Sequence, residues 1–386
     1  MTSLRPLPIA AGPAAAHALP VLRDAVGGEF AVLPYAAGGD PVPVPTGAVP
    51  DEGTALVVGT SGSTGSPKLA MLPATALAAS ARATHERLGG TGSWLLAMPP
   101  NHIAGVQVLL RCVAAGTEPG FVDLSDGFTA AAFAAAADSF DGDRRYTALV
   151  PTQLLRVLDD AGATRALAGF DAVLVGGAAT SPALLVRARE AGATVVTTYG
   201  MSETCGGCVY DGTPLATTAI RTDEEGRVHL GGDTLASGYL GRPDLTADAF
   251  VTDDEGVRWF RTDDLGHRDP ETDRWHVDGR IDDVITTGAM KISPRVVEEA
   301  LTSLPDIAEA VVLGLEDPEW GQVVAAAVVV RPGVRHPSVV QLRDALRGGL
   351  ADHALPRRLV VLEQLPLRGP GKPDRAGIAA LFHTRP

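Results

Sequence analysis

Short apolar runs alternate with helical stretches between residues 55 and 199 of the chain. The apolar runs predict strands, and the amphipathic or alanine-rich stretches between them predict helices. Because polar or glycine residues follow the strands, we expect a parallel sheet whose ligand lies beyond the strand ends. The predicted strands are 55–58, 146–150, 171–175 and 194–199. Three helices are predicted: the first begins near Pro73, the second covers 152–159 and the third covers 182–190.

The pattern changes twice in the second half of the chain. Three short strands, at 227–230, 257–261 and 274–277, are separated by Gly and Asp turns, which predicts an antiparallel or barrel-like subdomain. After Arg280 the pattern predicts a helix, two apolar strands, a second helix and a last strand. These elements are predicted at 294–303, 310–315, 323–330, 338–350 and 358–362. The fold class is therefore α/β, with a large domain at 1–281 and a small α+β domain at 282–386.

Composition and charge exclude several classes of protein. The chain has 386 residues, of which 45% are hydrophobic and 20% charged, as in a globular protein of two or three domains. Its net charge of −14 argues against a nucleic-acid partner. The apolar runs are too short to span a membrane, and prolines interrupt the alanine-rich N-terminus where a signal peptide would need an apolar core. Three cysteines, an odd number, favour the reducing cytoplasm.

A polar loop between the first predicted strand and its helix suggests a polyphosphate site. Glycines in such a loop let backbone N–H groups approach phosphate oxygens, hydroxyls donate hydrogen bonds, and the lysine neutralises charge. The order of residues differs from that of a Walker A loop. A flexible linker is disfavoured, because linkers rarely separate a buried strand from a helix. The loop consists of Thr60, Ser61, Gly62, Ser63, Thr64, Gly65, Ser66, Pro67 and Lys68.

This loop resembles the phosphate loop of the acyl-adenylate-forming superfamily. Four further motifs follow in that family's order, at 199–204, 261–266, 279–283 and 369–372. The short segment before Thr60 and the sequence 202–212 resemble the short o-succinylbenzoate–CoA ligases of menaquinone biosynthesis. The resemblance covers most of the chain. It implies a cytoplasmic AMP-forming acyl-CoA ligase that uses ATP, Mg²⁺ and coenzyme A, with a mobile C-terminal domain.

The resemblance also implies roles for individual residues. Carboxylates are activated by attack on the α-phosphate of ATP, a reaction that needs charge neutralised on the triphosphate. Lys372 is implied to bridge the carboxylate and the α-phosphate, Glu203 to bind Mg²⁺, and Thr204 to donate to the α-phosphate. Tyr199 and Gly200, with Gly176, Gly177 and Ala178, are implied to surround the adenine. Asp264 is implied to bind the ribose, and Arg280 the ribose or a phosphate. Asp282 is implied to be the hinge, and Gly288 to lie at the CoA channel.

Several assignments have two interpretations. His102 resembles the family's aromatic residue at the mouth of the acyl pocket, but a partly buried histidine that caps the following helix fits equally well. Cys205 and Cys208 have the spacing of a metal or redox pair, although small residues lining the acyl pocket explain them better. The acid could be another aryl or short acyl acid, the acceptor could be a carrier protein, and a non-catalytic nucleotide-binding protein is the alternative from another class. Two questions are left open: which residue binds a second carboxylate of the substrate, and whether the protein forms a homodimer.

Overall fold

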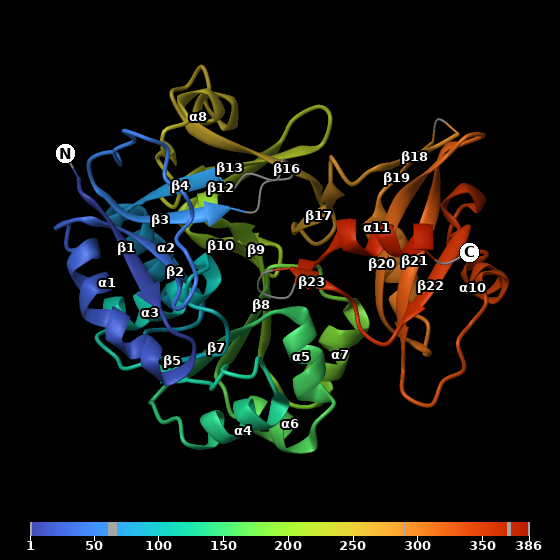
Figure 1. Cartoon of the computed structure of the whole chain (residues 1–386), viewed down its shortest axis with the longest axis horizontal. Coiled ribbons are helices and arrows are strands. Elements are labelled where there is room, and N and C mark those ends of the chain that lie inside the picture. Colours follow the sequence, from blue (N-terminus) through green and yellow to red (C-terminus); the bar gives the residue numbers. More distant parts are fainter. Residues whose placement is uncertain (1, 61–67, 289, 369–371, 385–386) are drawn as a thin grey trace. The chain divides into compact units, whose positions relative to one another are not determined.

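The computed structural model describes residues 2–60, 68–288, 290–368 and 372–384 (Figure 1). The chain divides into two compact units. The first consists of Met1–Ala178, Arg187–Arg221 and His229–Thr262, and the second of Ala179–Val186, Thr222–Val228 and Asp263–Pro386.

The secondary structure is that of a mixed α/β protein. The helices are η1 (Gly12–Ala18), α1 (Leu19–Val26), α2 (Ala74–Arg87), α3 (Ile103–Ala115), α4 (Ala130–Asp138), α5 (Pro151–Leu158), α6 (Ala161–Leu167), α7 (Pro182–Glu190), η2 (Ser202–Thr204), α8 (Pro243–Ala249), α9 (Pro294–Thr302), α10 (Val339–Leu346), η3 (Asp352–Ala354) and α11 (Arg375–Thr384). The strands are β1 (Leu4–Ile9), β2 (Ala31–Ala36), β3 (Thr54–Thr60), β4 (Lys68–Pro73), β5 (Ser93–Leu96), β6 (Gly120–Phe121), β7 (Arg145–Leu149), β8 (Ala172–Gly176), β9 (Val195–Met201), β10 (Gly206–Tyr210), β11 (Thr213–Pro214), β12 (Thr218–Thr222), β13 (Arg227–Gly232), β14 (Gly238–Tyr239), β15 (Phe250–Thr252), β16 (Arg258–Arg268), β17 (Trp275–Arg280), β18 (Ile285–Thr287), β19 (Met290–Ile292), β20 (Ile307–Asp317), β21 (Gly321–Val330), β22 (Arg358–Leu362), β23 (Leu367–Arg368) and β24 (Lys372–Pro373).

A seven-stranded sheet in the first unit carries the predicted parallel strands. Its order is β11-β10-β9-β8-β7-β5-β6, and β6, β5, β7, β8 and β9 are parallel. β10 turns back antiparallel to β9, which places the segment after Glu203 beside the end of that strand. The predicted parallel sheet is confirmed, and its strands are nearly continuous buried runs because helices cover such sheets.

A second sheet in the first unit positions the polar loop. Its order is β1-β2-β3-β4-β14, and β3 pairs antiparallel with β4 so that Thr60 lies opposite Lys68. The loop is therefore the connection of a hairpin, whereas the sequence pattern placed it between a strand and a helix. Strand β4 was missed by that pattern. Leu22 of α1, Leu77 of α2 and Leu109 of α3 belong to one large buried core.

The second unit contains the α+β module predicted after Arg280. Its sheet has the order β19-β18-β21-β20, and β22 pairs parallel with β21. Alternate residues of β20 and β21 point into two separate cores, as the two-residue period of a strand requires. Helices α9 and α10 contribute to one core and α11 to the other. The predicted module is confirmed, although α10 ends at Leu346, before the predicted end at 350.

The predicted antiparallel subdomain is a small open sheet. β16 pairs antiparallel with β15 through its first half and with β17 through its second half. Across the residues that the structure describes, the order β12-β13-β16-β15 does not close, so the expected barrel-like form is not found. No helix among these residues is both long enough and apolar enough to cross a membrane.

Candidate functional site

The loop lysine and the acidic residue of the second motif meet at Tyr239. Lys68 begins β4, and its Nζ lies 5.3 Å from the centroid of the Tyr239 ring. The Tyr239 hydroxyl donates to Glu203 Oε1 at 2.8 Å. Tyr239 and Glu203 are buried, at 3% and 7% exposure. The structure thus brings together a cation and a carboxylate that 134 intervening residues separate in the sequence. Ser61, Gly62, Ser63, Thr64 and Gly65 lie outside the described residues.

A tight turn after β9 fixes Glu203. Residues Ser202–Thr204 form the short helix η2, and the Thr204 hydroxyl donates to the Gly206 carbonyl at 2.8 Å and accepts from Met201 N at 3.0 Å. Ala236 N donates to the Glu203 carbonyl at 2.8 Å. These bonds hold the turn, so the fully buried Thr204 hydroxyl is engaged with the backbone. Donation from this hydroxyl to an α-phosphate, as the sequence predicts, requires it to exchange its Gly206 bond.

Two glycines let strands approach closely around the predicted adenine residues. A Cβ on Gly200 would lie 2.1 Å from the Gly206 carbonyl oxygen, and a Cβ on Gly176 would lie 2.2 Å from Thr198 Oγ1. Tyr199 is part-exposed on β9, and the exposed Gly177 and Ala178 follow the end of β8. The structure places these predicted residues on the adjacent ends of parallel strands β8 and β9.

Helix α3 begins at the segment that contains His102. His102 is the N-cap residue of α3, but its side chain makes no capping hydrogen bond to that helix. In the next turns, Ile103 and Gln107 face β10: a Cβ on Gly206 would lie 3.6 Å from Gln107 Cγ and 4.0 Å from Ile103 Cγ1. Helix α3 therefore packs directly against the small residues after Glu203, and the place of this segment at the acyl pocket stays a prediction.

The cysteines lie in unreactive surroundings. All three are fully buried, and burial raises the pKa of the Cys112 thiol to about 11 and that of Cys208 to about 12. Burial also raises the pKa of Cys205. Because the thiolate is the reactive and metal-binding form, these shifts disfavour both roles at neutral pH. No group of three or more metal-ligating residues occurs in the part of the chain that the structure describes.

In the second unit, Arg280 joins the predicted ribose residue to the predicted hinge residue. Asp264 of β16 lies opposite Arg280 of β17, with Oδ1 3.9 Å from Arg280 Nη1. Arg280 also binds Asp282 through two bonds, of 2.9 Å and 3.1 Å. Burial alone would lower the pKa of Arg280, but the hydrogen bonds and charge of Asp282, with Asp264 and Asp263, raise it. The guanidinium is thus permanently charged and held between the two carboxylates.

The two remaining predicted residues of the second unit lie in short hairpins. Gly288 follows β18 with φ +52°, its N–H donates to the Trp320 carbonyl at 2.9 Å, and a Cβ there would lie 2.9 Å from the Trp320 ring. Lys372 lies on β24 opposite Arg368 of β23, and its side chain is exposed. The glycines before Lys372 lie outside the described residues.

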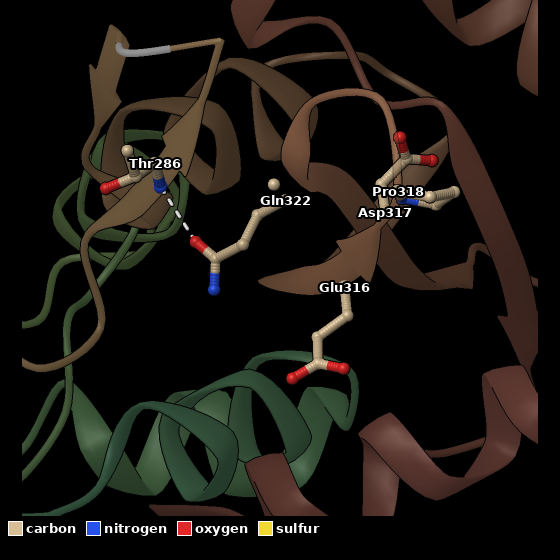
Figure 2. A pocket seen from close by; sticks show the side chains of 6 residues that line it. Thr286, Glu316, Asp317, Pro318 and Gln322 are labelled. Atoms are coloured by element: carbon tan, nitrogen blue, oxygen red, sulfur yellow. Dashed lines mark hydrogen bonds between the residues drawn. The ribbon is translucent and has the colours of Figure 1, made fainter.

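A hollow of about 720 Å³ in the second unit does not suit a nucleotide (Figure 2). Figure 2 shows Gln322 directed toward Thr286, whose N–H donates to Gln322 Oε1 at 2.8 Å. Glu316 and Asp317 also line the hollow. Their negative charge would repel phosphate, and none of the predicted site residues lines it.

Tyr239 is the site residue that the sequence patterns missed. It lies in Gly238-Tyr239-Leu240-Gly241, and the two residues of β14 pair with Met71 and Ala70 of β4. A tyrosine between glycines is the one local signal. Its importance comes from the bond to Glu203, which no spacing in the sequence predicts.

Family models match both halves of the chain. The model of the AMP-binding enzyme matches residues 25–259, and that of the AMP-binding enzyme C-terminal domain matches residues 296–372. Both matches confirm the resemblance predicted from the motifs, and with it the predicted class of acid–thiol ligase.

Individual relatives are similar over most of their length. The chain is 45% identical to a probable 2-succinylbenzoate–CoA ligase of Mycobacterium tuberculosis, with 98% of each chain covered. It is 30% identical to the 2-succinylbenzoate–CoA ligase of Enterococcus faecalis, covering 83% of this chain and 68% of the relative. The solved o-succinylbenzoate CoA synthetase of Bacillus subtilis, in complex with its acyl-adenylate intermediate, is 28% identical. That structure superimposes with a TM-score of 0.70, covering 84% of this chain and 69% of the other.

Proposed function

Because the chain belongs to the AMP-binding enzyme family, we propose that it is an AMP-forming o-succinylbenzoate–CoA ligase of menaquinone biosynthesis. The observation that carries this proposal is the 45% identity, over 98% of both chains, to the probable mycobacterial 2-succinylbenzoate–CoA ligase. The Lys68–Tyr239–Glu203 cluster supports it, because adenylation needs a cation and a carboxylate close to the triphosphate.

The proposed reaction has two steps. In the first, a carboxylate oxygen of the acid attacks the α-phosphorus of ATP, the bond to the β-phosphate breaks, and pyrophosphate leaves. In the second, the thiol sulfur of coenzyme A attacks the acyl carbon, its proton passes to solvent, and AMP leaves with the bonding electrons. The first step is needed because oxide is a poor leaving group, whereas AMP is a good one.

The residues of the first unit serve the adenylation step in this proposal. Lys68 neutralises phosphate charge next to the loop that begins at Thr60. Tyr199 and Gly200, with Gly176, Gly177 and Ala178, hold the adenine, and His102 closes the mouth of the acyl pocket. Thr204 holds the turn that presents Glu203.

A magnesium ion fits the chemistry of Glu203. Mg²⁺ is commonly bound by one or two carboxylates together with substrate phosphates, so a single buried carboxylate beside the phosphate loop suffices. When bound, the ion supplies charge neutralisation on the triphosphate. Tyr239 orients the carboxylate through its hydrogen bond to Oε1.

The residues of the second unit serve both steps. Lys372 stabilises charge on the α-phosphate and the attacking carboxylate during adenylation, and Asp264 accepts hydrogen bonds from the ribose. Arg280 positions Asp264 and holds Asp282, the proposed hinge at the boundary between residues 1–281 and 282–386. Gly288 faces coenzyme A during the second step.

The test is mass-spectrometric detection of the thioester after incubation with ATP, Mg²⁺, coenzyme A and a panel of acids. The panel contains o-succinylbenzoate, benzoates and short fatty acids. We expect o-succinylbenzoyl-CoA and AMP from o-succinylbenzoate alone. Turnover of another acid in preference would refute the substrate but keep the reaction. Acyl-AMP without thioester would favour a carrier-protein acceptor, and no acyl-AMP would favour the non-catalytic alternative.

A further inference from the structure

The segment of residues 236–239 holds Glu203 at two points. The N–H of Ala236 donates to the Glu203 carbonyl at 2.8 Å, and the Tyr239 hydroxyl donates to Glu203 Oε1 at 2.8 Å. The first bond fixes the main chain of the turn, and the second fixes the direction of the carboxylate. The orientation of Glu203 therefore depends on what holds segment 236–239 in place.

The sheet provides only part of that support. Strand β14 is an edge strand of two residues, so it makes few ladder hydrogen bonds of its own. On either side of its first ladder pair, the N–H groups of Ser237 and Leu240 donate to carbonyls of β4, at 2.9 Å and 2.8 Å. These bonds use N–H groups of the segment, and its first two carbonyls are bound by a side chain from another sheet.

That side chain is the half-buried Arg258 of β16. Its Nη1 donates to the Ala236 carbonyl and its Nη2 to the Ser237 carbonyl, each at 2.7 Å. Ala236 is fully buried, so its carbonyl needs a partner within the protein. The planar guanidinium presents two N–H groups in a fixed fork and reaches both carbonyls at once, a geometry that a lysine ammonium does not reproduce.

The Phe250 ring makes a second connection between Arg258 and Tyr239. The guanidinium carbon of Arg258 lies 4.4 Å from the centroid of the Phe250 ring. The same ring packs edge-on against Tyr239, with the centroids 5.8 Å apart and the ring planes at 60°. Both rings are buried. Arg258 is thus linked to Tyr239 through the main chain of segment 236–239 and through Phe250.

We propose that Arg258 is a positioning residue of the metal site: it fixes Tyr239, and Tyr239 orients the Glu203 carboxylate. This inference rests on the proposed function, in which Glu203 binds Mg²⁺. In this role Arg258 touches neither the nucleotide nor the acid. Without its guanidinium, segment 236–239 gains freedom, and the carboxylate is less often held in the direction that binding of the ion requires.

The test is Arg258→Met, made alone and together with Tyr239→Phe. Pyrophosphate release is measured against Mg²⁺ concentration. Mn²⁺ binding in the presence of a non-hydrolysable ATP analogue is measured by electron paramagnetic resonance, which requires no turnover. We expect Arg258→Met to raise the half-saturating Mg²⁺ concentration and to weaken Mn²⁺ binding about 5- to 30-fold, because it loosens a hydrogen bond to a charged group.

The double variant shows whether Arg258 acts through Tyr239. In the Tyr239→Phe protein, Arg258→Met should change the metal dependence less than about threefold, because the bond that it supports is already absent. Residues that act along one chain of contacts give such non-additive effects, whereas independent residues give additive ones.

Arg145→Met is the matched control. Arg145 also lies over a phenylalanine ring, 4.9 Å from the Phe170 centroid, and also donates to a backbone carbonyl, that of Ala137, at 2.7 Å. Its loss should lower the free energy of unfolding without moving the half-saturating Mg²⁺ concentration. A smaller folded fraction reduces the maximal rate, but it does not change how the remaining folded molecules bind the ion.

Arg258→Lys keeps the positive charge but not the fork. Its metal dependence should lie between those of the wild type and of Arg258→Met. If Arg258→Met does not fold, Arg258→Lys with and without Tyr239→Phe decides the question by the same comparison.

The outcomes separate the inference from the function on which it rests. Additive losses from the two substitutions, or an unchanged metal dependence in Arg258→Met, would overturn the role of Arg258 and leave the ligase activity intact. If the wild type adenylates no acid, the proposed function fails, and the Mn²⁺ titration alone decides on Arg258. If the wild type also binds no Mn²⁺ with the nucleotide, the inference fails as well.

Discussion

At the scale of single residues, the proposed adenylation chemistry depends most directly on the hydrogen bond between Tyr239 and Glu203. Tyr239→Phe should lower kcat/KM for adenylation about 10- to 100-fold, because a hydrogen bond to a buried carboxylate contributes about 1.5–3 kcal/mol. The ring that faces Lys68 is kept. The measurement is pyrophosphate release as a function of Mg²⁺ concentration.

Tyr146→Phe provides the control for this change. The Tyr146 hydroxyl is bonded to the carbonyls of Leu88 and Gly90, at 3.2 Å and 3.0 Å, in the same unit. Its loss should affect stability more than adenylation. Equal adenylation rates in both variants would show that Tyr239 does not orient Glu203 for catalysis.

His85 makes the stability of the first unit depend on pH. Burial, with a smaller effect of the Arg111 charge, lowers the pKa of His85 from 6.5 to about 4. The folded state therefore binds fewer protons than the unfolded state between these values. The stabilisation is fully present above pH 6.5 and is lost as the pH falls through 4.

The test of this dependence is urea unfolding of the wild type and of His85→Gln between pH 7 and pH 4. Glutamine can still accept the hydrogen bond from Trp94 Nε1, which lies 3.2 Å from His85 Nε2. The variant should lose less stability than the wild type over this interval. Parallel losses in the two proteins would assign the pH dependence to other groups, and His17→Gln, at an exposed histidine, is the control.

At the scale of elements, the approach of β9 to β10 depends on Gly200. A Cβ at this position would lie 2.1 Å from the Gly206 backbone oxygen, so one of the strands must move. Gly200→Ala should destabilise the protein by roughly 2–4 kcal/mol and disturb the turn that holds Glu203. The measurement is the urea midpoint together with adenylation.

Gly349→Ala is the matched control for this substitution. A Cβ on Gly349 would meet only the Leu346 carbonyl oxygen at 3.7 Å, an ordinary contact, so its midpoint should stay close to that of the wild type. A Gly200→Ala protein as stable as this control would mean that β9 and β10 can separate without cost.

The sequence predicted those elements whose hydrophobic period was clear. The buried strands β7 and β8, the helix α9 and the strand β22 lie within one residue of their predicted positions at each end. Strand β4 was missed because its apolar residues follow the polar loop directly and pair locally with β3. The predicted barrel-like form failed because closure depends on pairing between distant strands, which the pattern of single strands does not contain.

The same distinction applies to the site. The order of the motifs predicted Lys68, Glu203 and Lys372 as site residues, because each lies in a short sequence motif of unusual composition. Tyr239 was missed, because its contact is with Glu203, a residue 36 positions away in the sequence. Patterns in the local sequence do not predict contacts between residues so far apart.

At the scale of the whole molecule, the net charge of −14 opposes the binding of the proposed anionic ligands, which are ATP, coenzyme A and a dicarboxylate. Binding must therefore depend on a few well-placed cations. The chain has three lysines, and two of them, Lys68 and Lys372, lie in predicted phosphate-binding motifs. One of these lysines comes from each unit, which fits a reaction that needs both units for adenylation.

The proposed use of the second unit in both steps predicts opposite defects in two variants. Lys372→Ala should slow adenylation about 100- to 1000-fold and spare thioester formation from preformed acyl-AMP. Gly288→Ala should spare adenylation and slow thioester formation at least about tenfold, because its Cβ would lie 2.9 Å from the Trp320 ring in the segment that we propose to face coenzyme A. Each half-reaction is measured separately by rapid quench.

Gly333→Ala separates this effect from backbone strain. Gly333 also has a positive φ, of +81°, but a Cβ there would meet no atom within 4 Å, so the variant carries the strain without the steric clash. It should leave both half-reactions unchanged. If Lys372→Ala and Gly288→Ala instead impaired both half-reactions to the same extent, the second unit would not present different surfaces to the two steps. The proposed rotation at Asp282 would then be wrong, even if the ligase activity itself were confirmed.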